Sequence, residues 1–311
     1  MRVIPFGISS GRPTARRHVS GLGLDFGDHW VLIDCGEGTQ QQILRSPLKL
    51  SRLSAVFITH LHGDHVLGLP GLLSTMGMED RTQPLQLIGV DGMSRWLDVM
   101  QELPILGLAF SLIVSELVDD TLAGDAAALW PVATVGDITV EALPLRHRVP
   151  AFGYRFTEPS RPGRLDVARA RELGVADGPD LGRLTAGHTV AGTNGPVAPA
   201  DVVGPPRAGR VVTILGDTMA CAASVCLARD ADLLVHEATY GNAEEPLGER
   251  WKHATAAQAA TIARDAGASR LLINHFSSRY DDADVLVGEA RAVFGNTVAA
   301  IEGEPVDVPR R

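Results

Sequence analysis

Cysteine is scarce in this sequence, which has only Cys35, Cys221 and Cys226 among its 311 residues. No two of them form a Cys-x-x-Cys pair, and their number is odd. Both features are typical of a reduced, cytoplasmic protein rather than a disulfide-stabilised secreted one. We expect all three side chains to be small buried hydrophobes.

A long apolar run is also missing. The longest apolar region, Val99–Val114, is interrupted by Gln101, Glu102 and Pro104, whereas a membrane-spanning helix needs about 20 apolar residues in a row. The apolar stretch Val3–Ile8 is too short for the core of a signal peptide. These features predict a soluble, cytoplasmic protein that has no membrane partner.

Basic side chains are fewer than acidic ones, 28 against 37, so the formal net charge is −9. A negative chain is a poor electrostatic match for the phosphates of a nucleic acid. This argument is weak, because bound metal ions add positive charge and net charge does not describe local patches. Apolar residues make up 45% of the sequence, which excludes a generally disordered chain.

Short β-branched runs alternate with helical patterns along the chain. Strands are expected at Val31–Ile33, Ala55–Ile58, Leu85–Ile88, Ile138–Leu143, Val211–Leu215, Leu233–Val235 and Leu271–Ile273. Helices are expected at Thr39–Leu44, Leu69–Met76, Met93–Gln101, Cys221–Asp230, Thr255–Ala266 and Ala283–Val293. The repeated strand–loop–helix order predicts a layered α/β fold.

Residues 157–210 interrupt this order, because they are rich in proline, glycine and arginine. One short helix, Val167–Leu173, is the only regular element expected there. Loops of this length inside a compact domain are usually functional or disordered. We therefore expect a single domain over residues 1–311 that carries an insertion at 157–210.

Four possible metal ligands follow the expected strand Ala55–Ile58 directly: His60, His62, Asp64 and His65. Imidazole and carboxylate groups are ligands of catalytic zinc, whose sites leave one position for water. An isolated histidine is usually a packing or surface residue. Four candidates at this spacing make that interpretation a poor one.

Three further candidates follow other expected strands: His147, Asp217 and His275. Taken singly, Asp217 would be a turn residue and His275 a modest candidate. Catalytic loops gather at one edge of a sheet, so together they could complete three or four ligands for each of two metals. Two metals about 3.5–4 Å apart can bind the attacking and the leaving oxygen of a displacement and lower the pKa of a shared water to roughly 7. The set predicts hydrolysis, with phosphodiesters as a natural substrate class.

Longer strings around these residues resemble the ribonuclease Z family of the metallo-β-lactamase superfamily. They are Asp34–Gln40, Phe57–His65, Gly68–Ser74, His147–Tyr154, His236–Tyr240, His253–Thr255 and Asn274–Tyr280. The metal motif alone is shared with other hydrolases, and the remaining strings narrow the resemblance, which runs from about residue 2 to residue 309. The resemblance implies a metallo-β-lactamase fold: a four-layer αββα sandwich of two mixed β-sheets with helices on the outer faces.

The resemblance also implies two zinc ions per subunit. One would be held by His60, His62, His147 and Asp217, and the other by Asp64, His65, Asp217 and His275, with Asp217 as the bridge. Asp64 would in addition accept a proton.

Further roles are implied outside the ligand set. His253 would assist the departure of the 3′ oxygen, and His236 and Glu237 would orient it. Arg279 would contact a substrate phosphate. Ala254 replaces the serine that the family usually has after this histidine, but the histidine itself is intact.

The implied activity is that of a zinc-dependent endoribonuclease that removes the 3′ trailer from precursor tRNA by attack of metal-bound hydroxide. The products would be a 3′-OH on the tRNA and a 5′-phosphate on the trailer. The insertion would be the flexible arm that binds tRNA away from the cut, and Gly178 and Pro179 match the Gly-Pro motif of that arm. The family also implies a homodimer.

Two other functions remain open. Another dinuclear-zinc hydrolase of the same fold, such as a lactonase, an arylsulfatase or a small phosphodiesterase, would keep the seven ligands. It would not need the insertion or the string Gly36–Gln40. A non-catalytic RNA-binding scaffold would typically lose ligands, and here every ligand is present.

Overall fold

The computed structural model describes residues 1–103, 105–119, 124–125 and 128–310. The chain divides into two compact units. The main unit comprises Met1–Thr157 and Val211–Pro309, and the inserted unit comprises Glu158–Arg210. Among the described residues, no helix is both long and apolar enough to cross a membrane.

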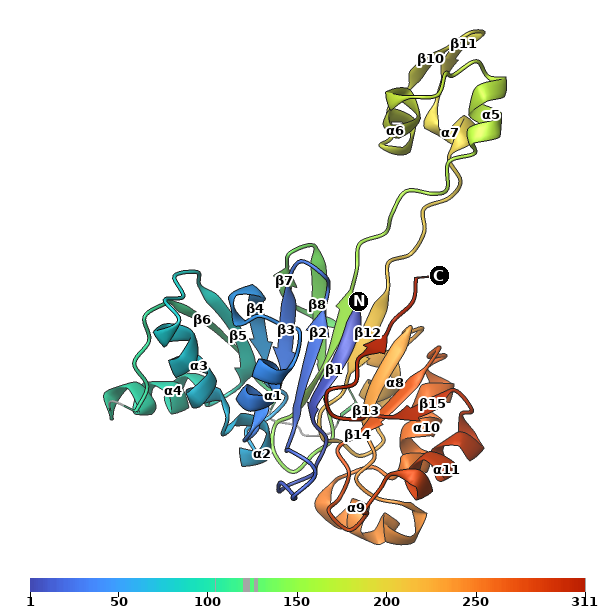
Figure 1. Ribbon diagram of the computed structural model, residues 1–311. Helices are drawn as coiled ribbons and strands as arrows, with labels where there is room; N and C mark the ends of the chain where they lie inside the picture. Colours follow the sequence, from blue (N-terminus) through green and yellow to red (C-terminus); the bar gives the residue numbers. More distant parts are fainter. Residues whose placement is uncertain (104, 120–123, 126–127, 311) are drawn as a thin grey trace. The chain divides into compact units, whose positions relative to one another are not determined.

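The first sheet of the main unit has seven strands in the order β16-β1-β2-β3-β4-β5-β6 (Figure 1). Their bounds are β1 Arg2–Gly7, β2 Gly21–Asp25, β3 Trp30–Ile33, β4 Leu53–Phe57, β5 Leu85–Val90, β6 Leu112–Leu117 and β16 Val306–Asp307. The pairs from β16 to β3 are antiparallel and those from β3 to β6 are parallel. The sheet is therefore mixed.

The second sheet also has seven strands, in the order β15-β14-β13-β12-β9-β8-β7. Their bounds are β7 Trp130–Val135, β8 Ile138–Pro144, β9 Phe152–Thr157, β12 Val211–Ile214, β13 Leu233–Glu237, β14 Leu271–Asn274 and β15 Thr297–Ala299. The strands from β15 to β12 pair parallel and those from β12 to β7 pair antiparallel. This sheet is mixed as well.

The two sheets pack face to face. The Phe57 ring of β4 lies edge-on to Tyr154 and Phe156 of β9, with centroids 5.1 and 5.2 Å apart. The Tyr154 hydroxyl donates a hydrogen bond of 2.7 Å to the Ile58 carbonyl. This contact joins the end of β4 to the opposite sheet, at the start of the loop that carries His60 and His62.

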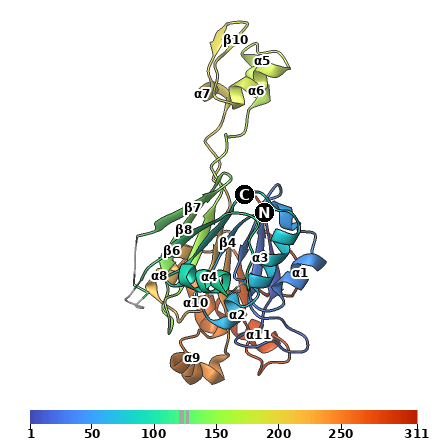
Figure 2. The same ribbon diagram turned by 90° about the vertical axis from the view of Figure 1, so that its left-hand side faces the viewer.

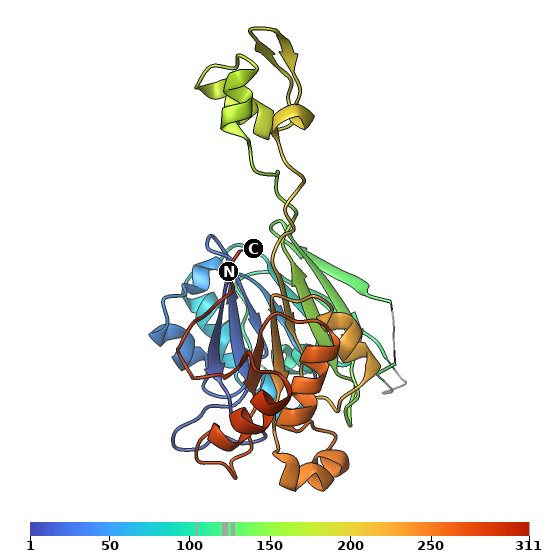
Figure 3. The same cartoon turned by 90° about the vertical axis from the view of Figure 1, so that its right-hand side faces the viewer.

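Helices cover the outer faces of both sheets (Figures 2 and 3). On the first sheet these are α1 Thr39–Arg45, α3 Leu69–Met78 and α4 Met93–Glu102; on the second they are α8 Ala222–Ala228, α10 Ala256–Asp265 and α11 Asp284–Val293. Every residue of β3 is apolar because both faces of the strand are buried. Val31 and Ile33 face the core between the sheets, while Trp30 and Leu32 face the core under the helices. The four-layer αββα arrangement confirms the predicted fold class.

All the strands and helices expected from the sequence outside the insertion are present, with ends within two residues of the expected ones. Cys35 is buried as predicted, but Cys221 and Cys226 are only half-buried. That part of the prediction is wrong, because the two side chains lie on α8 and at its start, at the surface of the second sheet's helical layer.

Two glycines near the first sheet lie where the backbone segments cross closely. A Cβ atom on Gly36 would collide with the Asp64 carbonyl, and one on Gly68 would collide with the Gly36 carbonyl. The crossing is closed by hydrogen bonds from the Cys35 N–H to the His65 carbonyl at 2.7 Å and from the Gly68 N–H to the Cys35 carbonyl at 2.9 Å. Only glycine permits this approach.

The inserted unit is folded, and the expectation of a single helix is wrong. It contains α5 Val167–Glu172, α6 Pro179–Thr185, α7 Pro199–Val202 and a hairpin of β10 Val190–Gly192 with β11 Gly195–Val197. Its own small core consists of Ala170, Val175, Leu184, Val190, Val197 and Val202. Two of its prolines did not mark loops: Pro179 and Pro199 each begin a helix, where the missing N–H removes no hydrogen bond.

Candidate metal centre

The ends of four strands supply the candidate ligands. His60 and His62 follow β4, His147 follows β8, Asp217 follows β12 and His275 follows β14. A short helix, α2 Gly63–Val66, carries Asp64 and His65.

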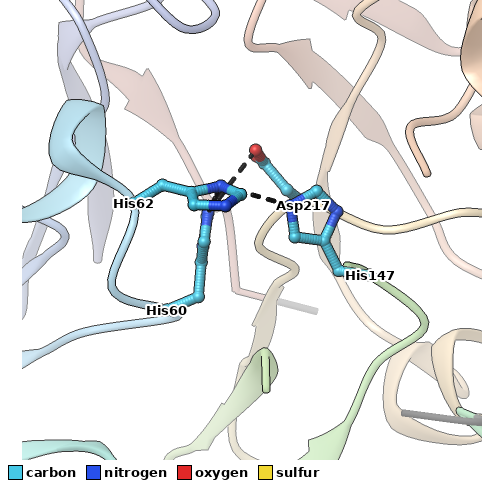
Figure 4. A group of neighbouring side chains, drawn as sticks. All are labelled: His60, His62, His147 and Asp217. Atoms are coloured by element: carbon cyan, nitrogen blue, oxygen red, sulfur yellow. Dashed lines mark hydrogen bonds and ion pairs between the residues drawn. The ribbon is translucent and has the colours of Figure 1, made fainter. Parts of the chain in front are cut away.

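The structure brings all seven predicted ligands together. One group, in which each side chain offers an atom within 4.8 Å of the others, contains His60, His62, His147 and Asp217 (Figure 4). Another contains Asp64, His65 and His275.

Asp217 lies between the two groups, because its oxygens face different partners. Oδ1 lies 3.5 Å from His65 Nε2 and 3.4 Å from His275 Nε2. Oδ2 lies 3.7 Å from His60 Nε2. One carboxylate can therefore touch an ion in either group.

Most of these histidines are oriented through the ring nitrogen that points away from the cluster. The anchoring contacts are His65 Nδ1 with Asp34 Oδ2 at 2.7 Å, His147 Nδ1 with the Lys252 carbonyl at 2.8 Å, and His275 Nδ1 with Thr239 Oγ1 at 3.0 Å. Such contacts fix the tautomer and leave Nε2 with its lone pair towards a metal. The Nε2 atom of His275 is buried and has no hydrogen-bond partner in the described part of the chain.

Burial is the main cause of the lowered pKa values of His60, His62 and His147, and for His62 the value falls to about 4. These rings are neutral near pH 7 and can act as ligands. His65 differs: burial lowers its pKa, but Asp217 and Asp34 outweigh this and hold the pKa well above its usual value. A divalent cation would compete with that proton.

Nitrogen-rich, buried and pre-oriented donors of this kind fit a divalent metal. Metal-binding histidines with anchored second nitrogens are typical of catalytic zinc sites. The donors present therefore match the metal centre that the sequence predicts.

His253 lies beside the cluster and is held by Glu237. Its Nδ1 atom lies 3.0 Å from Glu237 Oε1, and its ring stacks on the His275 ring at 5.6 Å. Burial lowers the pKa of His253, but the Glu237 carboxylate more than offsets this and raises it to about 9. With Nδ1 bound to Glu237, Nε2 is the position from which a proton can leave.

His236 does not take the position expected for it. Side chains alternate along a strand, so His236 and Glu237 point to opposite faces of β13. The ring of His236 is fully buried and its Nδ1 lies 2.8 Å from the Glu237 carbonyl oxygen. Within the described residues it has no contact with His253, so an orienting role for His236 is not supported.

A cavity of about 350 Å³ opens onto the metal centre. Its lining includes the ligands His62, Asp64, Asp217 and His275 together with His253 and Arg148. Arg279 lies in an adjoining open hollow with Ser10, Gly11, Arg12, Tyr240, Ser277 and Ser278. Ser10 and Gly11 line both spaces, so Arg279 lies near the centre without joining it.

Gly178 and Pro179 belong to the inserted unit, at the start of α6. Gly178 has a φ of 149°, a conformation that favours glycine. The backbone conformation therefore favours glycine at 178, and Pro179 suits the first position of the helix. Neither residue is among the metal ligands.

Sequence reasoning missed the anchoring groups. Asp34 is buried at the end of β3 and accepts hydrogen bonds from the Thr59 N–H and hydroxyl besides contacting His65. Asp34 and His275 both have positive φ angles, 57° and 60°, which are uncommon for non-glycine residues and occur more often at active sites. An aspartate directly after an apolar strand was the available signal for Asp34.

Comparisons with known proteins agree with this architecture. A family model described as a beta-lactamase superfamily domain matches residues 29–164. Curated proteins named Ribonuclease Z are similar over nearly the whole chain. The one from Salinibacter ruber is 44% identical over 94% of this chain and 89% of its own length. The one from Brevibacillus brevis is 40% identical over 100% and 98%.

Solved structures extend the comparison. The short form of human tRNase Z superposes with a TM-score of 0.73 at 28% identity, over 99% of this chain and 100% of its own. A metallo-beta-lactamase fold protein from Bacillus subtilis gives a TM-score of 0.68 at 20% identity, over 98% of both chains. The second likeness shows the fold alone.

Proposed function

Because this chain belongs to the ribonuclease Z family, it is a hydrolytic endoribonuclease that processes tRNA 3′ ends, and we propose that it removes the 3′ trailer with two zinc ions. The observation that carries the proposal is the gathering of seven ligand side chains in two adjacent groups, with Asp217 between them. A lactonase or arylsulfatase of the same fold is not favoured, since the full-length similarity is to Ribonuclease Z proteins.

Two divalent cations, when bound here, lower the pKa of water and neutralise charge on a phosphate. Asp64 is the residue that we propose takes the proton of the attacking water. Its Oδ2 atom accepts a hydrogen bond of 2.7 Å from the Gly11 N–H, which fixes the carboxylate at the wall of the cavity. Burial raises the pKa of Asp64, but the neighbouring His275 and His65 outweigh this and lower it, so the carboxylate is ionised and can accept a proton.

His253 supplies the proton for the leaving group. A 3′-oxyanion of ribose leaves poorly unless it is protonated, and a histidine can donate near neutral pH. Glu237 holds Nδ1 and keeps the ring charged, so that Nε2 carries the proton that is transferred. Cleavage on this side of the phosphorus leaves a 3′-OH on the tRNA and a 5′-phosphate on the trailer.

Arg279 is proposed to bind a backbone phosphate next to the one that is cut. It is exposed in the hollow beside the cavity, and its backbone N–H donates a hydrogen bond of 3.4 Å to Ser277 Oγ. An arginine there can make paired hydrogen bonds to a phosphate and adds positive charge where an acidic chain needs it.

The inserted unit is proposed to bind tRNA away from the cut, with Gly178 and Pro179 shaping its surface. We further propose a cytoplasmic homodimer, in which the inserted unit of one subunit binds the tRNA that the other cuts. These parts rest on the family resemblance. Sedimentation equilibrium of the purified protein tests the dimer, and a monomer at micromolar concentration would contradict it.

The reaction is tested with a 3′-extended precursor tRNA that carries one 2′-deoxy nucleotide before the cut. If water is the nucleophile, this substrate is cleaved and yields the same ends as the all-ribose substrate. Mapping the ends by primer extension and mass spectrometry reads out the result. An inert but still bound deoxy substrate, or a 2′,3′-cyclic phosphate product, would show that the 2′-OH attacks instead.

A further inference from the structure

Trp251 is an exposed tryptophan close to the metal centre, and core packing does not explain it. It is the last residue of α9, Glu245–Trp251, and 38% of its surface is exposed. The guanidinium carbons of Arg148 and Arg250 lie 4.9 and 5.0 Å from its ring centroid. In the described part of the chain its indole N–H has no hydrogen-bond partner.

The backbone ties this ring to the catalytic residues. Lys252, with a φ of 61°, stands between Trp251 and His253. Its carbonyl is the anchor for His147 Nδ1 at 2.8 Å. Arg148 follows His147 directly and lines the catalytic cavity. The tryptophan, its arginine and the two histidines are therefore fixed to one another.

We propose that Trp251 and Arg148 form a stacking surface for the base of the nucleotide that carries the leaving 3′ oxygen. The proposal rests on the proposed function, because it uses His253 as the proton donor to that oxygen. The nucleotide that carries this oxygen must lie on the His253 side of the cavity. Arg148 lines the cavity as His253 does, and the Trp251 ring lies against the Arg148 guanidinium. It would be the last nucleotide of the tRNA product.

The chemistry of the pair suits such a base. An indole face stacks on any nucleobase, and an arginine plane over the indole adds cation–π attraction and a positive charge near the phosphate. The chain as a whole carries a net charge of −9. Arg148 at the cavity therefore provides local attraction for RNA in an acidic chain.

The test compares two precursor tRNAs that differ only at the last nucleotide before the cut, which either has its base or is abasic. Trp251→Ala should lower kcat/KM on the intact substrate by about 5- to 100-fold, the usual value of one base–aromatic stack. On the abasic substrate the same substitution should change kcat/KM by less than about 2-fold, because no stack is left to lose. Most of the loss should appear in KM.

Trp251→Phe, which keeps an aromatic face, should recover most of the activity on the intact substrate. Arg148→Ala should show the same dependence on the base with a smaller loss. Arg95→Ala, which removes an exposed arginine on α4, serves as the matched charge control and should leave both substrates unaffected.

Turnover of bis-p-nitrophenyl phosphate by each variant reports on the metal centre independently of the base. Equal losses by Trp251→Ala on intact and abasic substrates would show that Trp251 only positions His253. A parallel loss on the small diester would show that it supports the metal centre through the Lys252 carbonyl and His147. Either result would overturn the stacking inference. Failure of the unsubstituted enzyme to cut precursor tRNA would instead refute the proposed function itself. The unsubstituted enzyme alone gives a further test. Its kcat/KM must be higher on the intact substrate than on the abasic one, and equal values would contradict the stacking inference.

Discussion

The main unit buries the charged groups of its metal centre, whereas the inserted unit carries most of its described ion pairs on the surface. Asp217 and Glu237 are 3% and 2% exposed in the main unit. Three ion pairs of the inserted unit, Arg169–Glu172, Arg171–Asp177 and Arg183–Asp180, are formed by exposed side chains. Buried charges need fixed partners or a metal, while exposed pairs contribute little to stability. The chemistry therefore depends on the main unit, and the inserted unit can contribute binding alone.

The largest effect is expected from removing the carboxylate between the two ligand groups. Asp217→Ala should greatly reduce the metal content of both positions and lower activity by more than the 10- to 100-fold typical of residues behind the ligands. Inductively coupled plasma mass spectrometry of fully loaded protein should give about two zinc ions per wild-type chain. The control is Asp180→Ala, an exposed acid of the inserted unit, which should keep its metals. Only one tightly bound metal in the wild type would contradict the dinuclear site.

His253→Ala tests whether His253 donates a proton to the leaving oxygen or only supports the structure of the metal centre. Turnover of precursor tRNA should fall by about 10²–10⁴-fold, the usual contribution of one general acid. With p-nitrophenyl esters the loss should be smaller, because that leaving group departs without a proton. Equal losses on both substrates would mean that His253 holds the site together rather than protonating the leaving oxygen.

Removing the inserted unit tests whether that unit contributes to the binding of tRNA alone. Arg161 and Arg207 exchange two backbone hydrogen bonds of 2.9 Å at its base, so residues 162–206 can be replaced by a two-residue turn. Cleavage of precursor tRNA should fall by about 10²-fold or more, as expected when a second binding site is lost. Hydrolysis of bis-p-nitrophenyl phosphate should persist, because remote binding energy matters only for the large substrate. Loss of both activities would show that the two units are coupled.

The smallest effect concerns the one largely buried ion pair of the inserted unit that we describe, Glu158 with Arg210. The hydrogen bond from Arg210 lowers the pKa of Glu158 to about 2. Because the folded pKa lies below the unfolded one, the pair stabilises fully above pH 4.5 and loses this as pH falls towards 2. Glu158→Gln should cost about 1 kcal/mol at pH 7.

Urea unfolding of wild type and variant at pH 7 and pH 3 measures this difference. It should shrink at the lower pH, and a difference that stays constant would contradict the assigned cause. Asp177→Asn, in an exposed pair, is the control and should have little effect at either pH.

The sequence predicted the ligands better than the groups that hold them. His60 to His65 are dense in sequence and follow a clear strand, so their convergence could be inferred from the chain alone. The Lys252 carbonyl that anchors His147 is a backbone atom, and no residue type marks it in a sequence. The expectation for His236 failed because neighbours on a strand face opposite ways, which a motif read as a string does not express.

The fold shows the same division. Strands such as β3 are apolar throughout because both faces are buried, and their sequence is unambiguous. The sequences of the short helices in the inserted unit are ambiguous, because a proline such as Pro179 or Pro199 is equally typical of a loop and of the start of a helix. The helices are stabilised by a core of six apolar side chains from positions spread along the inserted unit. A local sequence pattern does not show which of these side chains will pack together.

The close crossing at Gly36 and Gly68 has a consequence for mutational tolerance. Neither glycine touches a metal-binding atom, yet any side chain at either position displaces the backbone that carries His65 and Asp64. In a saturation screen for activity, these two positions would be as intolerant as the ligands themselves. A map of inactivating substitutions would therefore outline a region larger than the active site, and its edge would mark the backbone contacts that keep the ligands in register.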